Sequence, residues 1–581
     1  MSIPTSSFNS NTDRTTSNLH TPFPAFSQEI VARLMEFGAE QTFEAESFLF
    51  VRGSRDVDMF VVLDGELAVL DKIGQGECNV VAILREGQFT GELDLLDSRQ
   101  TLFDCRAVTA SRILRVGRAS LQQIMRSDIE IADLIMQACI SRRSDIMRHA
   151  SGGATLIGHE HSFDTIRLLR FFTRNGYPYR MLDPETNQEA DSLIHYFQLQ
   201  QEHLPVVLLG DHSVLRNPSI SLLADELGLT DMSDRKTVYD VAIVGAGPAG
   251  LAAAVYAASE GLSSIVVEGT APGGQAGTSS RIENYLGFPT GVSGQDLSDR
   301  SLVQAQKFGA RFAISREVVK MTRENETYFL HLEDGEPVKT RTVVIATGAR
   351  YQKLSVPNYQ RFEYQGIHYA ATAMEAGLCL NQEVIVVGAG NSAGQAALFL
   401  SQTSKCVHLL VRGENLQATM SDYLIQRILS SRRISLRVRT EIIRMDGDDR
   451  LQEVTWRDNS LMKMETRSVS NVFVMIGATP RTTWLCDDLA RDAKGFILTG
   501  SKARSEDFFG TNQEGVFAVG DVRSGSVKRV ASAVGEGSVV ISEIHRYLSA
   551  RNAPIEPVPT LNVAAQMASS ADANFPRFAS V

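Results

Sequence analysis

The sequence has no pair of cysteines at Cys-x-x-Cys spacing, although it contains six cysteines in 581 residues. Such pairs supply zinc ligands, redox dithiols and disulfide frameworks, so we expect none of these, and no metal centre. No apolar run approaches the about 20 residues that a helix needs to cross a bilayer. The first residues also lack the basic start and apolar stretch of a secretory signal. We therefore expect a cytoplasmic protein without a membrane span.

Dense positive charge is missing as well. The chain carries 57 Lys and Arg against 68 Asp and Glu, a formal net charge of −11. A net negative charge repels phosphate backbones, so nucleic acid is not an expected partner. What is present is 43% hydrophobic residues and 44 glycines, the composition of a globular protein with many tight turns. At the usual domain size the length predicts roughly three to five domains.

An all-β roll flanked by helices is predicted for residues 26–150, after a tail (residues 1–25) that we expect to be flexible. Short alternating strands fill this region, and a single helix is predicted over residues 120–147. Several motifs here resemble those of the cyclic-nucleotide-binding domain family, namely Gly53, Asp58, Phe60, Gly65 and the stretch FTGELDLL.

The resemblance implies that Gly91, Glu92 and Arg99 would hold the phosphate and ribose of a cyclic nucleotide. However, no small hydroxyl residue follows Arg99, and the loop is shorter than the family pattern. Without a well-placed arginine, a cyclic phosphate loses its strongest partner. We therefore favour a structural or dimerising roll, and cyclic-nucleotide binding stays the alternative.

Residues 151–232 alternate strand, helix, strand, helix and strand before a closing helix, an α/β order that resembles the glutaredoxin/thioredoxin fold. The resemblance places Ser162 and Thr165 where that family has its two redox cysteines, and Pro205 where it has a cis proline. Thiol exchange requires a thiolate, which neither position can supply. We expect this middle domain to dock or to act as a spacer.

A first glycine motif follows the strand YDVAIVG and precedes a helix, with the sequence Gly245-Ala246-Gly247-Pro248-Ala249-Gly250. In this strand–turn–helix context the glycines allow a tight turn, the approach of a pyrophosphate and close helix packing. The helix N-terminus adds N–H donors for the anion. Glu268 ends the next strand, near the spacing of about 20 residues at which a carboxylate binds a ribose. The motif predicts a bound adenosine diphosphate moiety.

Further motifs between residues 237 and 548 resemble the thioredoxin reductase family. They are Gly273-Gly274-Gln275, Glu283-Asn284, Gly287-Phe288-Pro289, TVVIATGA and GVFAVGDVRSG. The resemblance implies FAD as cofactor, bound by Gly245, Gly247, Pro248, Ala249, Gly250, Glu268, Gly274, Gln275, Asn284, Thr347, Gly348, Gly520 and Asp521. It implies an FAD-binding domain of residues 237–354 and 480–548, an inserted NAD(P)H-binding domain of residues 355–479, and a flexible tail of residues 549–581.

A second glycine motif lies in the inserted region, after the strand EVIVVG. The resemblance implies that it binds NAD(P)H through Gly388, Gly390, Asn391, Ser392, Ala393 and Arg412. Arg412, where an NAD-binding protein would have an acid, favours the 2′-phosphate of NADPH. The family's two other arginine positions hold Gly413 and Gln417, so NADH stays the alternative.

The redox dithiol of the resembled family is replaced. The stretch GIHYAATAMEA aligns with its Cys-x-x-Cys region and has Ala370 and Ala373 at the two cysteine positions. Alanine cannot act as the nucleophile of thiol–disulfide exchange. Cys379 and Cys406 have no partner close in sequence, and most free cysteines are buried apolar residues. No catalytic side chain is therefore predicted.

Together these patterns predict a multidomain protein with an N-terminal β-roll, a thioredoxin-like α/β middle domain and a C-terminal two-dinucleotide (Rossmann-like) flavoprotein. The predicted activity is hydride transfer from NAD(P)H to FAD and on to a non-dithiol acceptor, a protein or a small molecule. The N-terminal domains would regulate it, and we expect a homodimer. Two alternatives stay open: a thioredoxin-disulfide reductase that uses other cysteines, and a flavin- and nucleotide-binding sensor without turnover.

Overall fold

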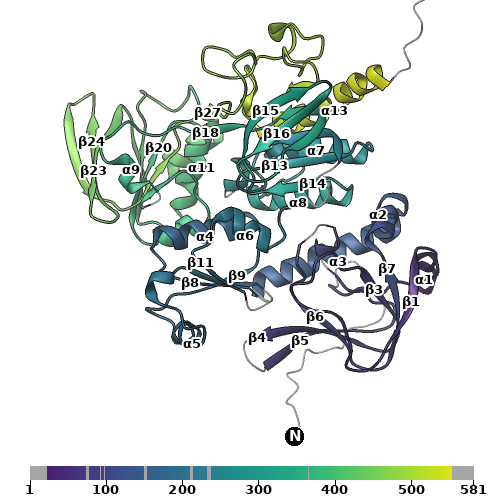
Figure 1. Cartoon of the computed structure of the whole chain (residues 1–581). Coiled ribbons are helices and arrows are strands. Elements are labelled where there is room, and N and C mark those ends of the chain that lie inside the picture. Colours follow the sequence, from purple (N-terminus) through teal and green to yellow (C-terminus); the bar gives the residue numbers. More distant parts are fainter. Residues whose placement is uncertain are drawn as a thin grey trace, which may run out of the picture.

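The computed structural model describes residues 22–73, 77–91, 93–96, 99–149, 153–209, 213–231, 237–279, 281–363 and 365–552 (Figure 1). Their strands form separate sheets that define four units along the chain. Within these residues no helix combines the length and apolar character that a bilayer crossing requires.

The N-terminal roll consists of two antiparallel sheets with strand orders β1-β7-β3 and β2-β6-β4-β5. Its strands are β1 (Gly38–Phe43), β2 (Phe48–Phe50), β3 (Met59–Asp64), β4 (Leu67–Ile73), β5 (Glu77–Leu84), β6 (Asp104–Ala107) and β7 (Ser111–Val116). Its helices are α1 (Gln28–Met35), α2 (Arg118–Ser127) and α3 (Ile129–His149). The predicted roll with flanking helices is confirmed.

The prediction of a single helix over residues 120–147 is wrong, because two helices, α2 and α3, meet at Asp128. This residue has extended backbone angles, and its side chain accepts the N–H of Ile131 at 3.1 Å. A short acid at this place caps the second helix, and such side-chain bonds compete with a continuous helix.

The middle unit has one four-stranded sheet in the order β11-β10-β8-β9, in which β8 is parallel to β9 and antiparallel to β10. Its elements follow as β8 (Ala154–Ile157), α4 (Phe163–Arg174), β9 (Tyr179–Leu182), α5 (Gln188–Tyr196), β10 (Val206–Leu208), β11 (Val214–Arg216) and α6 (Ile220–Glu226). The Leu204–Pro205 peptide bond is cis. Strand β11 was not predicted, because its three residues are too short to show a period.

The third unit, called here the first dinucleotide unit, is a sheet with a parallel core in the order β14-β13-β12-β17, extended by β28 beside β17. The antiparallel β16 and β15 continue it. The strands are β12 (Val238–Val244), β13 (Ser264–Glu268), β14 (Arg311–Ile314), β15 (Val318–Glu324), β16 (Thr327–Leu332), β17 (Val338–Ile345) and β28 (Val516–Ala518). The helices are α7 (Pro248–Ser259), α8 (Gly294–Lys307) and α13 (Val530–Asn552). The continuous apolar runs of β12, β13 and β17 fit strands that helices cover.

The fourth unit, the second dinucleotide unit, is inserted into the third. Its parallel sheet has the order β19-β26-β20-β21-β22, and an antiparallel sheet β23-β24-β25 lies beside it. The strands are β19 (Ile367–His368), β20 (Glu383–Val387), β21 (Cys406–Leu410), β22 (Ile434–Arg437), β23 (Thr440–Gly447), β24 (Leu451–Asp458), β25 (Lys463–Ser468) and β26 (Val472–Val474). The helices are α9 (Tyr359–Phe362), α10 (Ala373–Leu378), α11 (Asn391–Leu400) and α12 (Asp422–Ser430). The chain enters and leaves through an antiparallel ribbon of β18 (Ala349–Tyr351) and β27 (Ala478–Pro480).

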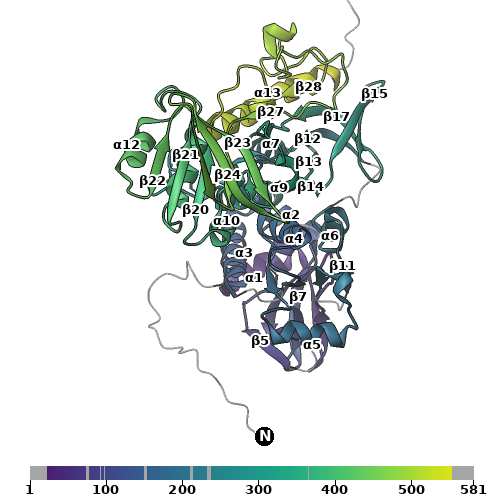
Figure 2. The same cartoon turned by 90° about the vertical axis from the view of Figure 1, so that its left-hand side faces the viewer.

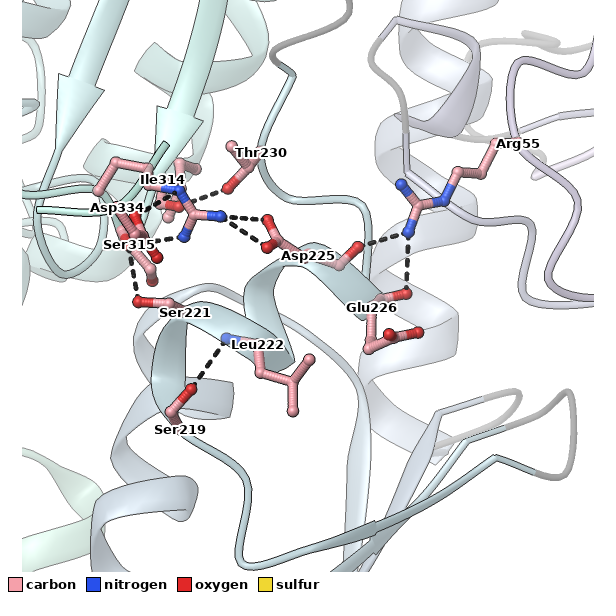
Figure 3. A network of polar contacts seen from close by, with 11 residues as sticks. Arg55, Ser219, Ser221, Leu222, Asp225, Glu226, Thr230, Ile314, Ser315 and Asp334 are labelled. Carbon is pink, nitrogen blue, oxygen red and sulfur yellow. Dashed lines mark hydrogen bonds and ion pairs between the residues drawn. The ribbon is translucent and has the colours of Figure 1, made fainter. Parts of the chain in front are cut away.

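Helix α6 joins the middle unit to two others (Figure 3). Arg316, which follows β14, donates to both carboxylate oxygens of Asp225 at 2.5 and 2.6 Å and forms an ion pair with Asp334 at 3.2 Å. From the roll, Arg55 donates to the carbonyls of Asp225 and Glu226 at the C-terminal end of α6. A cation is favourable at that end of a helix. The roll and the first dinucleotide unit therefore contact the same helix turn.

Candidate functional site

The first glycine motif begins where β12 ends and α7 starts. Gly245 has a φ of +107°, and a Cβ there would lie 2.4 Å from the carbonyl oxygen of Ala346. A Cβ at Gly250 would lie 1.8 Å from the carbonyl oxygen of Gly245. Both positions therefore require glycine because the backbone leaves no room for a side chain, whether or not a ligand is bound.

Gly247 differs from its two neighbours in the motif. It is the N-cap of α7, with Pro248 in the first turn, and its φ is −71°. A Cβ added there would meet no heavy atom of the described residues within 4 Å. Open space therefore faces the N-terminus of α7, where the free N–H groups favour an anion. The pyrophosphate expected from the sequence would need this space.

Glu268 ends β13 beside this turn and is 8% exposed. Its carboxylate accepts the N–H of Ala246 at 2.7 Å and the N–H of Thr270 at 2.9 Å. These bonds fix the acid next to the first glycine motif. A fixed carboxylate at this position suits the hydroxyls of a ribose.

The loop that contains Gly274 and Gln275 packs onto the first motif. Gly273 donates its N–H to the carbonyl of Ala246 at 2.7 Å, and a Cβ at Gly274 would lie 3.1 Å from the Cα of Gly247. Gln275 donates to the carbonyl of Ala349 in the ribbon at 2.5 Å. The loop thus connects the first motif to the ribbon between the two dinucleotide units.

Other residues implied by the resemblance lie around the same unit. Asn284 is exposed, and its neighbour Glu283 forms an ion pair with Arg427 of α12 at 2.6 Å. Thr347 donates to the carbonyl of Arg481 at 2.9 Å, and Gly348 has a φ of +62°.

At the C-terminal strand, Gly520 has a φ of +74° and donates its N–H to Glu536 of α13 at 2.6 Å. Glu536 also pairs with Arg523 at 2.5 Å. Burial raises the pKa of Asp521, the next residue along the chain. The sequence analysis did not identify Glu536 as a residue of the site. Its one signal in the sequence is that a glycine of the same helix stands on each side of it. A Cβ at one of them, Gly537, would lie 2.2 Å from the carbonyl of Ala249, so α13 packs tightly on α7.

The second glycine motif repeats this local structure between β20 and α11. Gly388 has a φ of +146°, and a Cβ there would lie 2.3 Å from the carbonyl oxygen of Met475. Gly390 is the N-cap of α11, and the nearest atom to its added Cβ is 4.0 Å away. Asn391 binds Ser421 twice, at 2.7 and 3.0 Å, and so fixes the start of α12. Ser392 is exposed and Ala393 is buried.

Arg412 is exposed and is the second residue of the segment that follows β21, as a residue for an anionic group should be. Arg439 lies close to the same segment: it donates its N–H to the carbonyl of Gly413 at 2.9 Å, and its side chain pairs with Glu414 at 2.5 Å. Sequence reasoning missed Arg439, because only the turn between β22 and β23 brings it to this loop.

The segment with Ala370 and Ala373 lies against the first dinucleotide unit. Ala371 forms an isolated parallel β-bridge with Ser279, in the loop that follows Gln275. Tyr369 stacks on Tyr351 of the ribbon, with ring centroids 5.7 Å apart. The two alanines are therefore next to the loop that packs on the first glycine motif.

The two cysteines considered as replacements are poor nucleophiles. Burial raises the pKa of Cys379 to about 11 and also raises the pKa of Cys406. A thiol with a raised pKa is protonated near neutral pH and does not attack a disulfide.

In the roll, the backbone carbonyl of Gly91 is bound by a residue that was not predicted, and a Cβ at Gly91 would lie 2.4 Å from the side chain of Leu95. Arg142 of α3 donates to the carbonyls of Gly91, Phe89 and Pro22, and its guanidinium lies 4.6 Å from the ring centroid of Phe89. Arg99 is 6% exposed. Glu92 lies outside the described residues.

In the middle unit, the hydroxyls of Ser162 and Thr165 are 2.7 Å apart at the start of α4. Nearby, His159, Asp183 and Glu185 place potential metal ligands within 4.8 Å of one another. Each carboxylate oxygen of Asp183 accepts a backbone N–H at 2.9 Å. The acid therefore has a structural role in its turn that requires no metal.

Known proteins resemble two parts of the chain. Residues 239–537 match the family model described as pyridine nucleotide-disulphide oxidoreductase, and residues 40–128 match that of the cyclic nucleotide-binding domain. A thioredoxin reductase of Treponema pallidum is 32% identical over 314 residues, which cover 54% of this chain and 98% of that protein. One from Mycolicibacterium smegmatis is 32% identical over 318 residues, with coverages of 55% and 99%. The solved thioredoxin reductase of Lactococcus lactis is 28% identical, with a TM-score of 0.50 and coverages of 54% and 99%.

Proposed function

Because this chain belongs to the pyridine nucleotide-disulphide oxidoreductase family, we propose that it transfers hydride from NAD(P)H to FAD and passes the electrons to an acceptor other than a dithiol of its own. The chain is a homologue of thioredoxin reductases. The observation that carries the proposal is the pair of Ala370 and Ala373 beside an intact dinucleotide motif. The acceptor is then a separate protein or small molecule.

The residues of the first dinucleotide unit suit FAD. Open space at Gly247, the fixed carboxylate of Glu268 and the free N–H groups of α7 match a pyrophosphate and a ribose. Bound FAD would supply the hydride-accepting ring, and no acid or base from the protein is required for that transfer. The task of the chain is to bind both nucleotides, to orient them and to exclude water.

The division into domains follows the four units. We propose a roll of residues 26–150, a middle domain of residues 151–232, an FAD-binding domain of residues 237–354 and 480–548, and an NAD(P)H-binding domain of residues 355–479. A thioredoxin fold for the middle domain is supported by its element order, its sheet order and the cis Pro205. Ser162 and Thr165 carry no thiol, which favours a docking role over a redox role.

The donor is tested by mixing the FAD-loaded protein anaerobically with NADPH or NADH and following the flavin absorbance. We expect bleaching within minutes, and faster with NADPH, because the exposed guanidinium of Arg412 can meet a 2′-phosphate. The variant Arg412→Ser should lower the preference for NADPH about ten-fold, the loss of one charge-assisted contact.

As a control, Arg412→Ser should leave the rate with NADH unchanged, because NADH carries no 2′-phosphate. A wild-type rate that is equal for the two nucleotides would contradict the role of Arg412. Failure of both nucleotides to bleach the flavin would overturn the proposed function and favour the sensor alternative.

For the roll we propose a structural role without a bound cyclic nucleotide. Arg142 already donates hydrogen bonds to the carbonyls of Phe89 and Gly91, and the side chain of Leu95 packs against Gly91. We expect cyclic AMP and cyclic GMP at millimolar concentration to leave the Tm of the protein unchanged, because a ligand stabilises only a fold that binds it. A concentration-dependent rise in Tm with either nucleotide, and not with the linear 5′-monophosphate, would contradict this role.

A further inference from the structure

Helix α4 of the middle unit lies along the side that faces the two dinucleotide units in both views (Figures 1 and 2). Arg170 and Arg174 are four residues apart on α4, so their side chains share one face of the helix. Each of them contacts a different dinucleotide unit. The family model of pyridine nucleotide-disulphide oxidoreductases matches residues 239–537, so α4 lies outside the part of the chain that it describes.

Arg174 contacts the first dinucleotide unit. Its guanidinium donates to the carbonyl of Gly274 at 3.1 Å, and its own carbonyl accepts from the side chain of Gln295 of α8 at 3.1 Å. Gly274 follows Gly273, and both have positive φ values. Two consecutive glycines make a segment with little conformational preference, so its position depends on its contacts. Arg174 is one such contact, and it comes from another domain.

Arg170 contacts the second dinucleotide unit. Its guanidinium lies 3.4 Å from Nδ1 of His368 and 3.7 Å from the carboxylate of Glu375. His368 is 3% exposed, and its Nε2 lies 2.9 Å from the side-chain oxygen of Asn471. Burial lowers the pKa of His368. A neutral ring can donate from Nε2 to Asn471 and accept from Arg170 at Nδ1, which satisfies both nitrogens.

The chain passes between the two dinucleotide units through the ribbon of β18 and β27, which pair over three residues each. The ion pair of Glu283 with Arg427 and the β-bridge of Ser279 with Ala371 also join the two units. A short two-stranded ribbon is a weak restraint on the relative orientation of two domains. One rigid helix that contacts both units on either side of the ribbon restrains that orientation.

We propose that α4 is a clamp that fixes the two dinucleotide domains relative to each other, with Arg174 as a positioning residue for the loop at the FAD site. This inference rests on the proposed function, because it assigns the loop of Gly273 and Gly274 to the flavin. It gives the thiol-less middle domain a task that requires no redox chemistry.

The test uses the full-length protein loaded with FAD and four single variants. Arg174→Met and Arg170→Met keep the apolar stem and remove the donors, and Arg174→Lys keeps one donor. The matched control is Arg167→Met, on the same helix, because the guanidinium of Arg167 donates to Asp164, Asn217 and Pro218, which all lie within the middle unit. The measurements are the rate of FAD release, from flavin fluorescence after dilution, and amide hydrogen exchange.

We expect Arg174→Met to release FAD about ten-fold faster, the loss of one charged hydrogen bond, and to speed exchange in residues 273–279. Arg174→Lys should restore most of the wild-type rate. Arg170→Met should speed exchange in residues 367–375 and leave FAD release nearly unchanged, and Arg167→Met should change neither.

Equal behaviour of Arg174→Met and Arg167→Met, whether both fast or both unchanged, would overturn the clamp. So would wild-type exchange of residues 367–375 in Arg170→Met. If the purified protein takes up no FAD at all, the proposed function fails. Amide hydrogen exchange in residues 273–279 and 367–375 then still decides whether α4 restrains these two segments.

Discussion

Replacing Gly247 by valine is expected to give a folded protein that binds no FAD. The backbone of Gly247 has a φ of −71°, which valine adopts, and no described heavy atom lies within 4 Å of an added Cβ. The protein itself can therefore accept the side chain, at a cost of about 1 kcal/mol for a poorer N-cap. The space that valine fills is the one that a pyrophosphate needs at the start of α7. We expect an affinity loss of at least about a hundred-fold, because steric exclusion also removes the N–H contacts.

The measurement is flavin absorbance per protein chain after incubation with FAD, together with the thermal unfolding curve. Gly377→Val is the matched control, because an added Cβ there also meets no described atom within 4 Å, but on α10 of the other dinucleotide unit. It should keep full flavin content. A Gly247→Val protein with one FAD per chain would show that the first glycine motif does not hold the pyrophosphate.

Placing cysteines at residues 370 and 373, in the variant Ala370→Cys/Ala373→Cys, is expected to double the electron capacity of the protein. FAD takes up two electrons and two protons, and a disulfide between the new cysteines would take up two more of each as it opens to a dithiol. The β-bridge between Ala371 and Ser279 holds this segment beside the loop that packs on the first glycine motif. Exchange of electrons with the flavin is therefore expected at this place.

Anaerobic titration with dithionite counts the electrons directly. The wild-type protein and the control Ala370→Ser/Ala373→Ser should each take up two electrons per FAD, and the cysteine variant four. A cysteine variant that still takes up two, although its thiols form a disulfide in air, would show that residues 370 and 373 do not stand in for a flavin-coupled dithiol. Four electrons in the wild-type protein would show that other cysteines are redox-active.

The local parts of the site could be predicted from the sequence because their physical causes are local. Gly245 and Gly250 follow from a turn that leaves no room for a Cβ, and the same turn recurs at Gly388. Such a turn is encoded within a few residues, together with the strand before it and the helix after it. The absence of a thiol at Ala370 and Ala373 also follows from residue identity alone.

Contacts between residues far apart in the chain could not be predicted in this way. Glu536 reaches Gly520 because α13 packs on α7, and Arg142 reaches Gly91 because α3 folds back onto the roll. A hydrogen bond to a backbone carbonyl leaves no motif in a sequence, because any residue offers the same acceptor. Strand β11 and the interruption of the helix at Asp128 could not be predicted because each is too short to change the hydrophobic periodicity of the sequence.

By itself, then, the sequence determined the two glycine motifs and the alanines at residues 370 and 373, since each depends on residue types at short spacing. Only the tertiary structure decided that Arg170 and Arg174 contact different dinucleotide units, that Arg142 donates to the carbonyl of Gly91, and that α6 is shared by the roll and the first dinucleotide unit. The physical reason is that the fold, and not the spacing along the chain, determines which group a long, flexible arginine side chain meets.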